Sequence, residues 1–248
     1  AVAGKTGRIL QMGFVYRYGP ASQTARAFLD AGRVGEIYHA KATLYRRRGI
    51  PGLGGWFTTR AISGGGPLID IGVHAIDQVL YLMDFPIPRR VSGKVYCNFG
   101  KRMGDYVYEG MWAGPPKLDG VCDVEDAAHA LVRFDGGLTL DVNVTWAGNF
   151  PQQRMPNLIA VMGDKGGLTF SLGGSDVVLS TEMDGRNVDI EPQMKKADRW
   201  DGQYEAFIHS VTTREQPPAT GEHGRVVQAI IDAVYRSSDE DREVEVEL

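Results

Sequence analysis

The middle of the chain contains strand-like segments that follow one another through short turns. Residues 127–134 and 138–146 flank Asp-Gly-Gly, residues 158–162 and 167–172 flank Gly-Asp-Lys-Gly, and residues 177–181 form a further apolar run. Short turns of this kind join antiparallel neighbours, whereas parallel neighbours need a long crossover. The sequence therefore predicts an antiparallel sheet, and this feature restricts the possible folds more than any other.

Three more segments are predicted to be strands. Residues 36–45 alternate between apolar and polar side chains, and residues 90–99 have a similar strand-like character. Residues 243–248 are predicted to form a terminal strand on which Glu245 and Glu247 face water, as on a protected sheet edge.

Helical segments surround these strands. Helices are predicted from Ser22 to Gly32, over residues 67–83, over residues 200–214 and after Thr220. Together these elements predict an α+β fold, with an antiparallel open-faced β-sheet and helices on one face. Because the other face needs a cover, we expect a homo-oligomer joined through the sheet face.

The helix over residues 200–214 has an apolar stripe. We expect this stripe to face the core; its members are Tyr204, Phe207, Ile208 and Val211.

The helix over residues 67–83 carries a different stripe. At about 100° per residue, Asp70, His74, Asp77 and Tyr81 fall within a polar seam roughly 60° wide. A solvent-facing stripe would normally contain Lys, Glu or Arg, and this helix has none. The seam therefore indicates the wall of a site. A metal site is the alternative, but no further ligand cluster completes a coordination shell, so we predict no metal.

Composition narrows the range of partners. The net charge is −4, and the charges of both signs are interspersed, which argues against nucleic acid or a membrane surface as a partner. The two cysteines, Cys97 and Cys122, have no metal-site or disulfide-framework spacing, which is compatible with a cytoplasmic location. A small molecule or another protein chain is the expected partner.

The segment from Ser63 to Asp77 resembles the substrate-site helix of the glucose–fructose oxidoreductase, inositol dehydrogenase and MocA (Gfo/Idh/MocA) family of NAD(P)-dependent oxidoreductases. Its Asp-x-x-x-His-x-x-Asp pattern after a glycine run is the most specific element. Further segments similar to that family are residues 13–18, 31–37, 124–126, 205–209 and 220–223. The resemblance covers nearly the whole chain and implies the family's C-terminal substrate domain.

The resemblance implies roles for two residues of the seam. His74 would be the general acid/base for a substrate hydroxyl, and Asp70 would orient the substrate and the imidazole. Imidazole suits this role because it titrates near neutral pH and can both accept and return a proton. The implied reaction oxidises the CH–OH group of a sugar, inositol or related polyol, with NAD or NADP as cofactor.

Five more residues are candidates for substrate contact. Asp77 and Tyr81 continue the seam, and Arg17 and Tyr18 follow a segment expected to adjoin the cofactor cleft. Trp56, or one of the arginines at 46–48, would help to enclose a polar substrate, although a triple arginine is also typical of a solvated turn.

The chain departs from the family in its nucleotide-binding elements. It has neither G-x-G-x-x-G nor Glu-Lys-Pro, so the cofactor-binding residues are unknown. Residues 1–18 are interpreted as the remnant last strand of a nucleotide-binding domain and residues 19–248 as a substrate-binding and oligomerisation domain. We therefore expect a truncated chain that is inactive alone. The alternatives are a non-catalytic sugar-binding or scaffold domain, and a family branch that uses NAD transiently to cleave glycosides.

Overall fold

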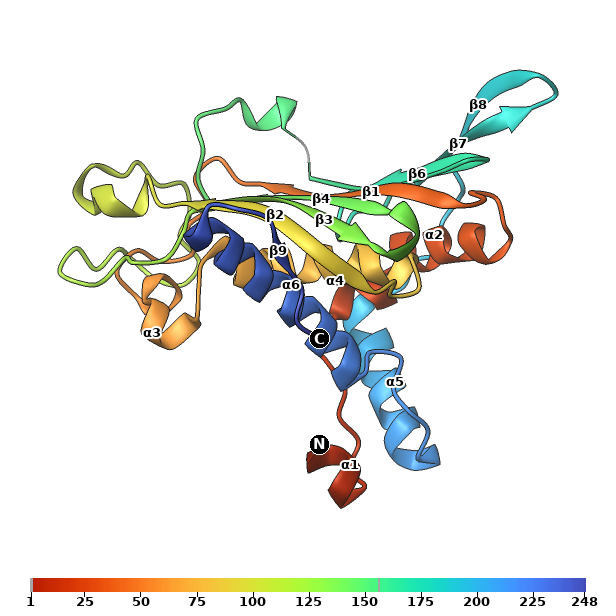
Figure 1. The fold of residues 1–248 in the computed structure, drawn as a ribbon, viewed down its shortest axis with the longest axis horizontal. Helices are drawn as coiled ribbons and strands as arrows, with labels where there is room; N and C mark the ends of the chain where they lie inside the picture. The colour runs from red at the N-terminus through yellow and green to blue at the C-terminus, as the bar shows by residue number, and fades with distance from the viewer. Residues whose placement is uncertain (1, 156) are drawn as a thin grey trace.

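The fold is a large open sheet with helices on one face, as the sequence predicts (Figure 1). The structure is a computed structural model that describes residues 2–155 and 157–248. Within these ranges the sheet has nine strands in the order β8-β7-β6-β5-β1-β4-β3-β2-β9. The strands are β1 (Ile37–Tyr45), β2 (Pro88–Tyr96), β3 (Ala127–Phe134), β4 (Thr139–Thr145), β5 (Leu158–Gly163), β6 (Gly166–Phe170), β7 (Val178–Met183), β8 (Arg186–Ile190) and β9 (Val244–Glu245).

The helical elements lie between and after these strands. The α-helices are α1 (Val2–Thr6), α2 (Pro20–Asp30), α3 (Arg60–Ser63), α4 (Val73–Leu82), α5 (Arg199–Thr213) and α6 (Gly221–Glu240). A π-helical turn, η3 (Leu68–Gly72), runs directly into α4. Short 3-10 turns are η1 (Val15–Tyr18), η2 (Trp56–Thr58), η4 (Gly100–Asp105), η5 (Asp135–Gly137) and η6 (Gln152–Arg154).

One strand pair differs from the predicted antiparallel pattern. β1 and β4 are parallel, with Ala40 opposite Leu140 and Ala42 opposite Val142. The other named pairs in the sheet are antiparallel. Hairpin turns indicate only how consecutive strands pair, so the contact between β1 and the much later β4 was not visible in the sequence.

The hairpin of β7 and β8 was missed. Its turn is formed by Asp184 and Gly185, which both have positive φ. Asp-Gly is a strong signal for a two-residue hairpin turn, so this strand could have been predicted. At the other edge, the expected terminal strand over residues 243–248 is reduced to Val244–Glu245, which pair with β2.

The core lies between the sheet and the helices beneath it. The side chains of Ile76, Val79 and Leu80 on α4 are fully buried, as are Ala42 on β1 and Val142 on β4. α6 packs along β2 and also contacts α4. Helix α4 is therefore packed between the sheet and α6. Because its middle is buried, a ligand-binding site on α4 is expected near one of its ends.

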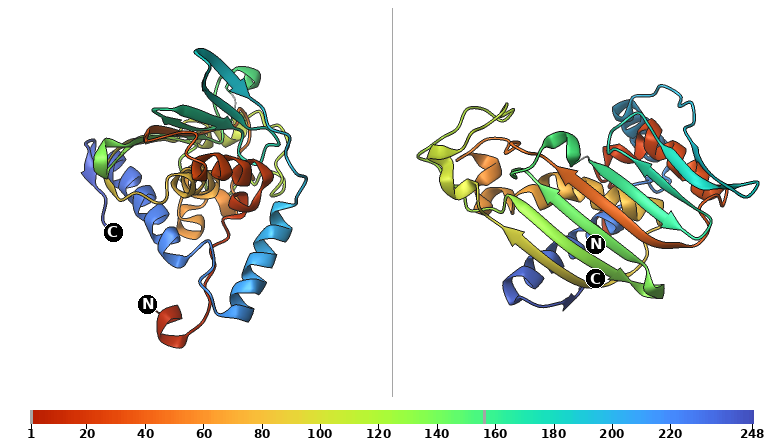
Figure 2. Two further views of the ribbon diagram at one scale, coloured as in Figure 1. Left: turned by 90° about the vertical axis from the view of Figure 1, so that its right-hand side faces the viewer. Right: turned by 90° about the horizontal axis from the view of Figure 1, so that it is seen from above.

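Among the described residues no α-helix covers the opposite face of the sheet (Figure 2, right). Its side chains are partly exposed and form cross-strand pairs: His39 Nδ1 lies 2.9 Å from Thr139 Oγ1, and His129 Nδ1 lies 2.7 Å from Asn143 Oδ1. Such an open, half-polar face is typical of a sheet with one solvated side.

The strand expected within residues 1–18 is not formed in the described residues. Gln11 forms only an isolated bridge with Thr220, and residues 15–18 form the 3-10 turn η1. A buried strand needs neighbouring strands on both sides, and within the described residues no named strand pairs with this segment. Phe14, Val15 and Arg17 are nevertheless buried, because η1 packs against α2, α4 and α5.

The stripe on α5 does not face the core as predicted. Tyr204, Phe207, Ile208 and Val211 are between 40% and 63% exposed. The reason is the direction of the helix, since α5 projects away from the sheet and packs mainly on η1 (Figure 1).

No helix in the described ranges is long and apolar enough to cross a membrane. Those ranges also contain no group of three or more His, Cys, Asp or Glu residues that could hold a metal ion.

Candidate functional site

The helix that carries the polar seam begins on a buried carboxylate. Glu125 Oε1 accepts hydrogen bonds from the N–H groups of Gly66 (2.9 Å) and Leu68 (3.2 Å) and from the Tyr235 hydroxyl (2.9 Å). Only glycine fits at position 66, because a Cβ there would lie 2.0 Å from the Glu125 carbonyl oxygen. These contacts fix the point at which η3 and α4 leave the sheet.

Asp70 lies in the π-helical turn and is half-buried. Its Oδ2 accepts a hydrogen bond of 3.0 Å from the indole N–H of Trp146. Burial raises the pKa of Asp70, while the Trp146 bond and the nearby Arg46 charge oppose that rise. Among the described residues its hydrogen-bond partner is therefore Trp146 and not His74, which was the expected neighbour. π-helical turns are frequent at functional sites, and this one turns Asp70 toward Trp146.

His74 lies in the first turn of α4 and is half-buried. Its ring meets the Tyr16 ring edge-on, with the centroids 5.2 Å apart. Burial and the positive charge of Arg199 lower the pKa of His74, so the imidazole is neutral at pH 7. Its Nδ1 atom is buried and has no hydrogen-bond partner in residues 2–155 and 157–248.

A small cavity lies beside His74. Its volume is about 70 Å³, below the range of roughly 300–1,000 Å³ that is typical of ligand pockets. The cavity is lined by Tyr16, Leu44, Arg46, Ile71, His74, Asn157 and Leu172. Sequence reasoning selected His74 from this set and considered Arg46 only as one of three arginines. Tyr16 and Asn157 were missed, since neither belongs to the seam.

The second half of the seam has a different environment. Asp77 and Arg17 are each 1% exposed and form an ion pair with an Nε to Oδ2 distance of 2.9 Å. Arg17 Nη1 also donates to the Pro218 carbonyl oxygen (2.8 Å) and lies 3.1 Å from His223 Nδ1. Neither residue has surface with which to contact a small molecule, so the structure places both in a buried link between η1, α4 and the start of α6.

Tyr81 and Tyr18 lie close to this link. The guanidinium carbon of Arg17 lies 5.2 Å from the centroid of the Tyr81 ring. Gln23 Nε2 donates a long hydrogen bond of 3.5 Å to the Tyr81 hydroxyl. Burial raises the pKa of both tyrosines. Neither Tyr81 nor Tyr18 lines the cavity beside His74.

Trp56 lies elsewhere. It is 57% exposed on η2 and makes an edge-on contact with Phe57, which in turn contacts Trp112. It is not part of the His74 cavity. The structure thus brings His74 and Arg46 to one cavity, and the Arg46 charge also acts on Asp70. The other four candidates do not line this cavity: Asp77, Tyr81, Tyr18 and Trp56.

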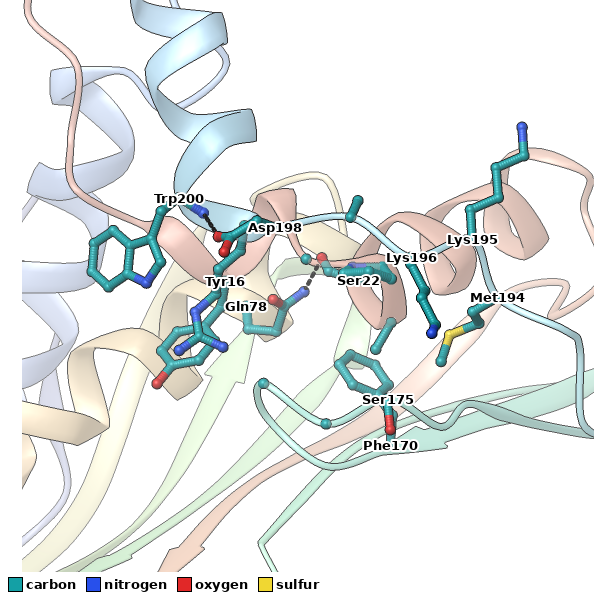
Figure 3. A pocket seen from close by; sticks show the side chains of 17 residues that line it. Tyr16, Ser22, Gln78, Phe170, Ser175, Met194, Lys195, Lys196, Asp198 and Trp200 are labelled. Atoms are coloured by element: carbon teal, nitrogen blue, oxygen red, sulfur yellow. Dashed lines mark hydrogen bonds between the residues drawn. The ribbon is translucent and has the colours of Figure 1, made fainter.

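A larger cavity adjoins the first one across Tyr16, which lines both (Figure 3). Its volume is about 580 Å³. One wall is the first turn of α2, another is the segment 194–200 before and at the start of α5, and glycines 173 and 174 form a third. Gln78 and Ser22 lie between these walls, and Gln78 Nε2 donates to Ser22 Oγ at 2.8 Å.

Comparison with known proteins gives consistent results. A family model described as the GFO/IDH/MocA C-terminal domain matches residues 22–169. D-glucoside 3-dehydrogenase of Escherichia coli (strain K12) is 30% identical over 247 residues, which are 98% of this chain and 66% of that protein. A putative UDP-kanosamine synthase oxidoreductase subunit of Amycolatopsis mediterranei (strain S699) is 32% identical over 170 residues, or 67% of this chain and 44% of that protein.

Solved structures show the same fold. An aldose-aldose oxidoreductase from Caulobacter crescentus, complexed with glycerol, has a TM-score of 0.76 at 22% identity and covers 98% of this chain and 65% of its own. Levoglucosan dehydrogenase in complex with NADH and levoglucosan has a TM-score of 0.80 at 17% identity and covers 99% of this chain and 68% of its own. The chain thus spans about two thirds of the length of these relatives. From the family match over residues 22–169, the chain belongs to the GFO/IDH/MocA family and contains its C-terminal domain.

Proposed function

We propose that this chain is the substrate domain of an NAD(P)-dependent oxidoreductase that acts on the CH–OH group of a sugar, inositol or related polyol. The observation that carries the proposal is His74, a neutral imidazole beside a cavity that also presents the cation Arg46 and the amide Asn157. The names of the relatives, which include a glucoside dehydrogenase and a levoglucosan dehydrogenase, support the substrate class.

The proposed chemistry assigns the proton to His74. Oxidation of an alcohol removes a hydride and a proton, and a bound nicotinamide cofactor would supply the hydride acceptor. The neutral imidazole is ready to take the hydroxyl proton, and the lowered pKa helps it to give that proton up again. Arg46 and Asn157 are suited to hold sugar hydroxyls, and Asp70 acts as a positioning residue that is itself held by Trp146.

The residues present fit only this acid–base half of the reaction. A dinucleotide normally binds a glycine-rich loop that follows a parallel strand and opens a helix. The sheet in the described ranges has one parallel pair, β1 with β4, and no G-x-G-x-x-G sequence follows either strand. We therefore propose that NAD or NADP is held by a separate nucleotide-binding domain.

The apolar side of α5 supports such a partner domain. Its exposed stripe of Tyr204, Phe207, Ile208 and Val211 projects from the helical side of the molecule, as does the N-terminal segment (Figure 1). An exposed patch of this kind is typical of an interaction surface.

We propose separately that the open sheet face joins copies of the chain. A monomeric mass by light scattering at micromolar concentration would count against this.

The expectation that this chain does not bind the cofactor tightly is tested on the chain itself. Calorimetric titration with NADH and NADPH is expected to give no tight binding, and micromolar affinity would contradict the assignment. A chain that neither binds cofactor nor gains activity when a nucleotide-binding domain is supplied would favour the alternative, a non-catalytic sugar-binding or scaffold domain.

The role of His74 is tested by His74→Gln in the protein supplied with that domain. We expect kcat to fall by about 10²–10⁴-fold, because the general base is lost. His39→Gln is the matched control, since His39 lies on the open sheet face and its bond with Thr139 can be retained. An unchanged kcat for His74→Gln would remove His74 from its proposed role.

A further inference from the structure

The larger cavity has the features of an anion site. α2 begins with Gly19 at its N-cap and Pro20 at its first position, and no side chain caps it in the part of the chain that the structure describes. The N–H groups of Ala21 and Ser22 therefore have no acceptor within the helix, although both residues are less than 5% exposed. Uncapped N–H groups at the positive end of a helix dipole favour an oxyanion.

A buried side chain points to a ligand at the same place. Gln78 is fully buried and lines the cavity, and its amide nitrogen is bonded to Ser22. Its Oε1 atom has no hydrogen-bond partner among the residues described. A buried acceptor without a partner is costly, so a ligand hydroxyl that donates to this oxygen would be favoured.

The charges around the cavity are mainly positive. Lys196 directs its ammonium group into the cavity, whereas the neighbouring Lys195 points away from it (Figure 3). The Arg199 side chain lies over the Tyr16 ring, with the guanidinium carbon 4.9 Å from the centroid. The one acidic residue in this wall, Asp198, is engaged in capping α5 through the Trp200 N–H at 2.7 Å.

Glycine keeps the third wall open. Gly173 has φ of +74°, and a Cβ there would lie 2.8 Å from the Tyr16 ring and 3.3 Å from Arg199. Tyr16 lines both this cavity and the one beside His74, so the two cavities lie next to each other. The larger cavity falls in the size range of ligand pockets, which the smaller one does not.

We propose that the cavity between α2 and residues 194–200 binds the phosphate of a phosphorylated sugar whose reacting carbon lies beside His74. The phosphate oxygens accept from the N–H groups of Ala21 and Ser22 and from Lys196, and a sugar hydroxyl donates to Gln78 Oε1. This inference rests on the proposed function and narrows its substrate class from sugars in general to sugars that carry a phosphate.

Binding to the full chain is measured by calorimetry with four probes: inorganic phosphate, glucose 1-phosphate, glucose 6-phosphate and glucose. We expect inorganic phosphate to bind and at least one sugar phosphate to bind more tightly than either inorganic phosphate or glucose. If neither sugar phosphate exceeds inorganic phosphate, the inference is overturned. NADP⁺ is a fifth probe, and binding tighter than that of both sugar phosphates would assign the cavity to the cofactor instead.

Two pairs of variants locate the site. Lys196→Met is expected to weaken phosphate binding roughly tenfold, whereas Lys195→Met leaves it unchanged, because only Lys196 points inward. Gly19→Asp places a carboxylate at the N-cap of α2 and should remove phosphate binding while stabilising the helix. Gly19→Ala adds the same Cβ, 3.3 Å from the Tyr16 carbonyl oxygen, without the charge and should retain binding.

Equal effects within either pair would contradict the site. These measurements need no cofactor and no turnover, so they fail independently of the proposed function. Turnover of a neutral sugar that depends on His74, in a protein that does not bind phosphate, would keep the oxidoreductase assignment and reject this inference.

Discussion

Two polar groups on one helix have opposite environments. Asp77, in the middle of α4, is sealed with Arg17 in an ion pair in which both partners are buried. His74, less than one turn earlier, is half-buried beside a cavity and has a ring nitrogen without a partner in the described residues. In the sequence the two residues belong to the same polar stripe. In the structure Asp77 is part of a buried ion pair, whereas His74 lines a cavity.

The difference shows what separates a structural polar residue from a candidate functional one. Arg17 satisfies the Asp77 carboxylate and also reaches the Pro218 carbonyl and the His223 ring, so this group is complete within the chain. The group at His74 is incomplete, and incomplete polar groups at a cavity are where a ligand can bind. A buried charge whose hydrogen bonds are all made within the chain therefore indicates a structural role and not substrate binding.

The largest effect is expected from breaking the paired group. Asp77→Asn should lower the free energy of unfolding by about 3–5 kcal/mol, because it leaves the Arg17 charge buried without a counter-ion. Asp84→Asn is the matched control, since Asp84 pairs with Arg26 at the surface and should cost less than about 1 kcal/mol. Urea denaturation measures both variants. Similar values for the two would show that the burial of the Arg17–Asp77 pair has no energetic consequence.

A smaller effect on the free energy of unfolding is expected from lowering the pH. His223 Nδ1 accepts from Arg17 and from the Thr220 N–H, so the ring must be neutral there; burial, followed by the Arg17 charge, lowers its pKa to about 4. Between pH 6.5 and 4 the unfolded chain binds a proton that the folded chain does not, so stability falls as the pH falls through this window. His74, whose pKa is also lowered, acts in the same direction.

The loss assigned to His223 is roughly 1–2 kcal/mol after allowance for solvent screening. It is measured as the free energy of unfolding in urea at pH 7 and pH 4.5. His223→Gln should reduce the difference between the two values, because glutamine keeps a capping side chain but does not titrate. An undiminished difference would place the acid sensitivity in other groups.

The smallest effect on stability is expected at the incomplete group. His74→Gln should lower the free energy of unfolding by about 1 kcal/mol or less, since the ring loses its edge-on contact with Tyr16 but its Nδ1 atom has no partner to lose among the described residues. The same variant is expected to lower turnover strongly, as proposed above. A loss of stability as large as that of Asp77→Asn would make His74 a structural residue and end the contrast between the two halves of the seam.

Local patterns predicted most elements of the fold. Alternation and short turns located β1 to β7 to within a few residues, and the Thr220 cap located α6, where Thr220 Oγ1 accepts from the His223 N–H. The patterns failed where partners are remote in the sequence. The parallel contact of β1 with β4, the 3-10 turn in place of a strand at residues 15–18 and the exposed side of α5 all depend on which segments lie nearby.

For the candidate site too, local spacing predicted one part and contacts between remote segments determined the other. Helical spacing by itself brought Asp70, His74, Asp77 and Tyr81 to one stripe, because side-chain direction along a helix depends only on the backbone. Which of them meets a cavity was decided by tertiary structure: η1 brings Arg17 to Asp77 and Tyr16 to His74, and Arg46, the residue after β1, lines the cavity beside His74. The sequence determined the elements and the residue types, and packing decided which polar groups were satisfied, because burial and pairing depend on segments that only the folded chain brings together.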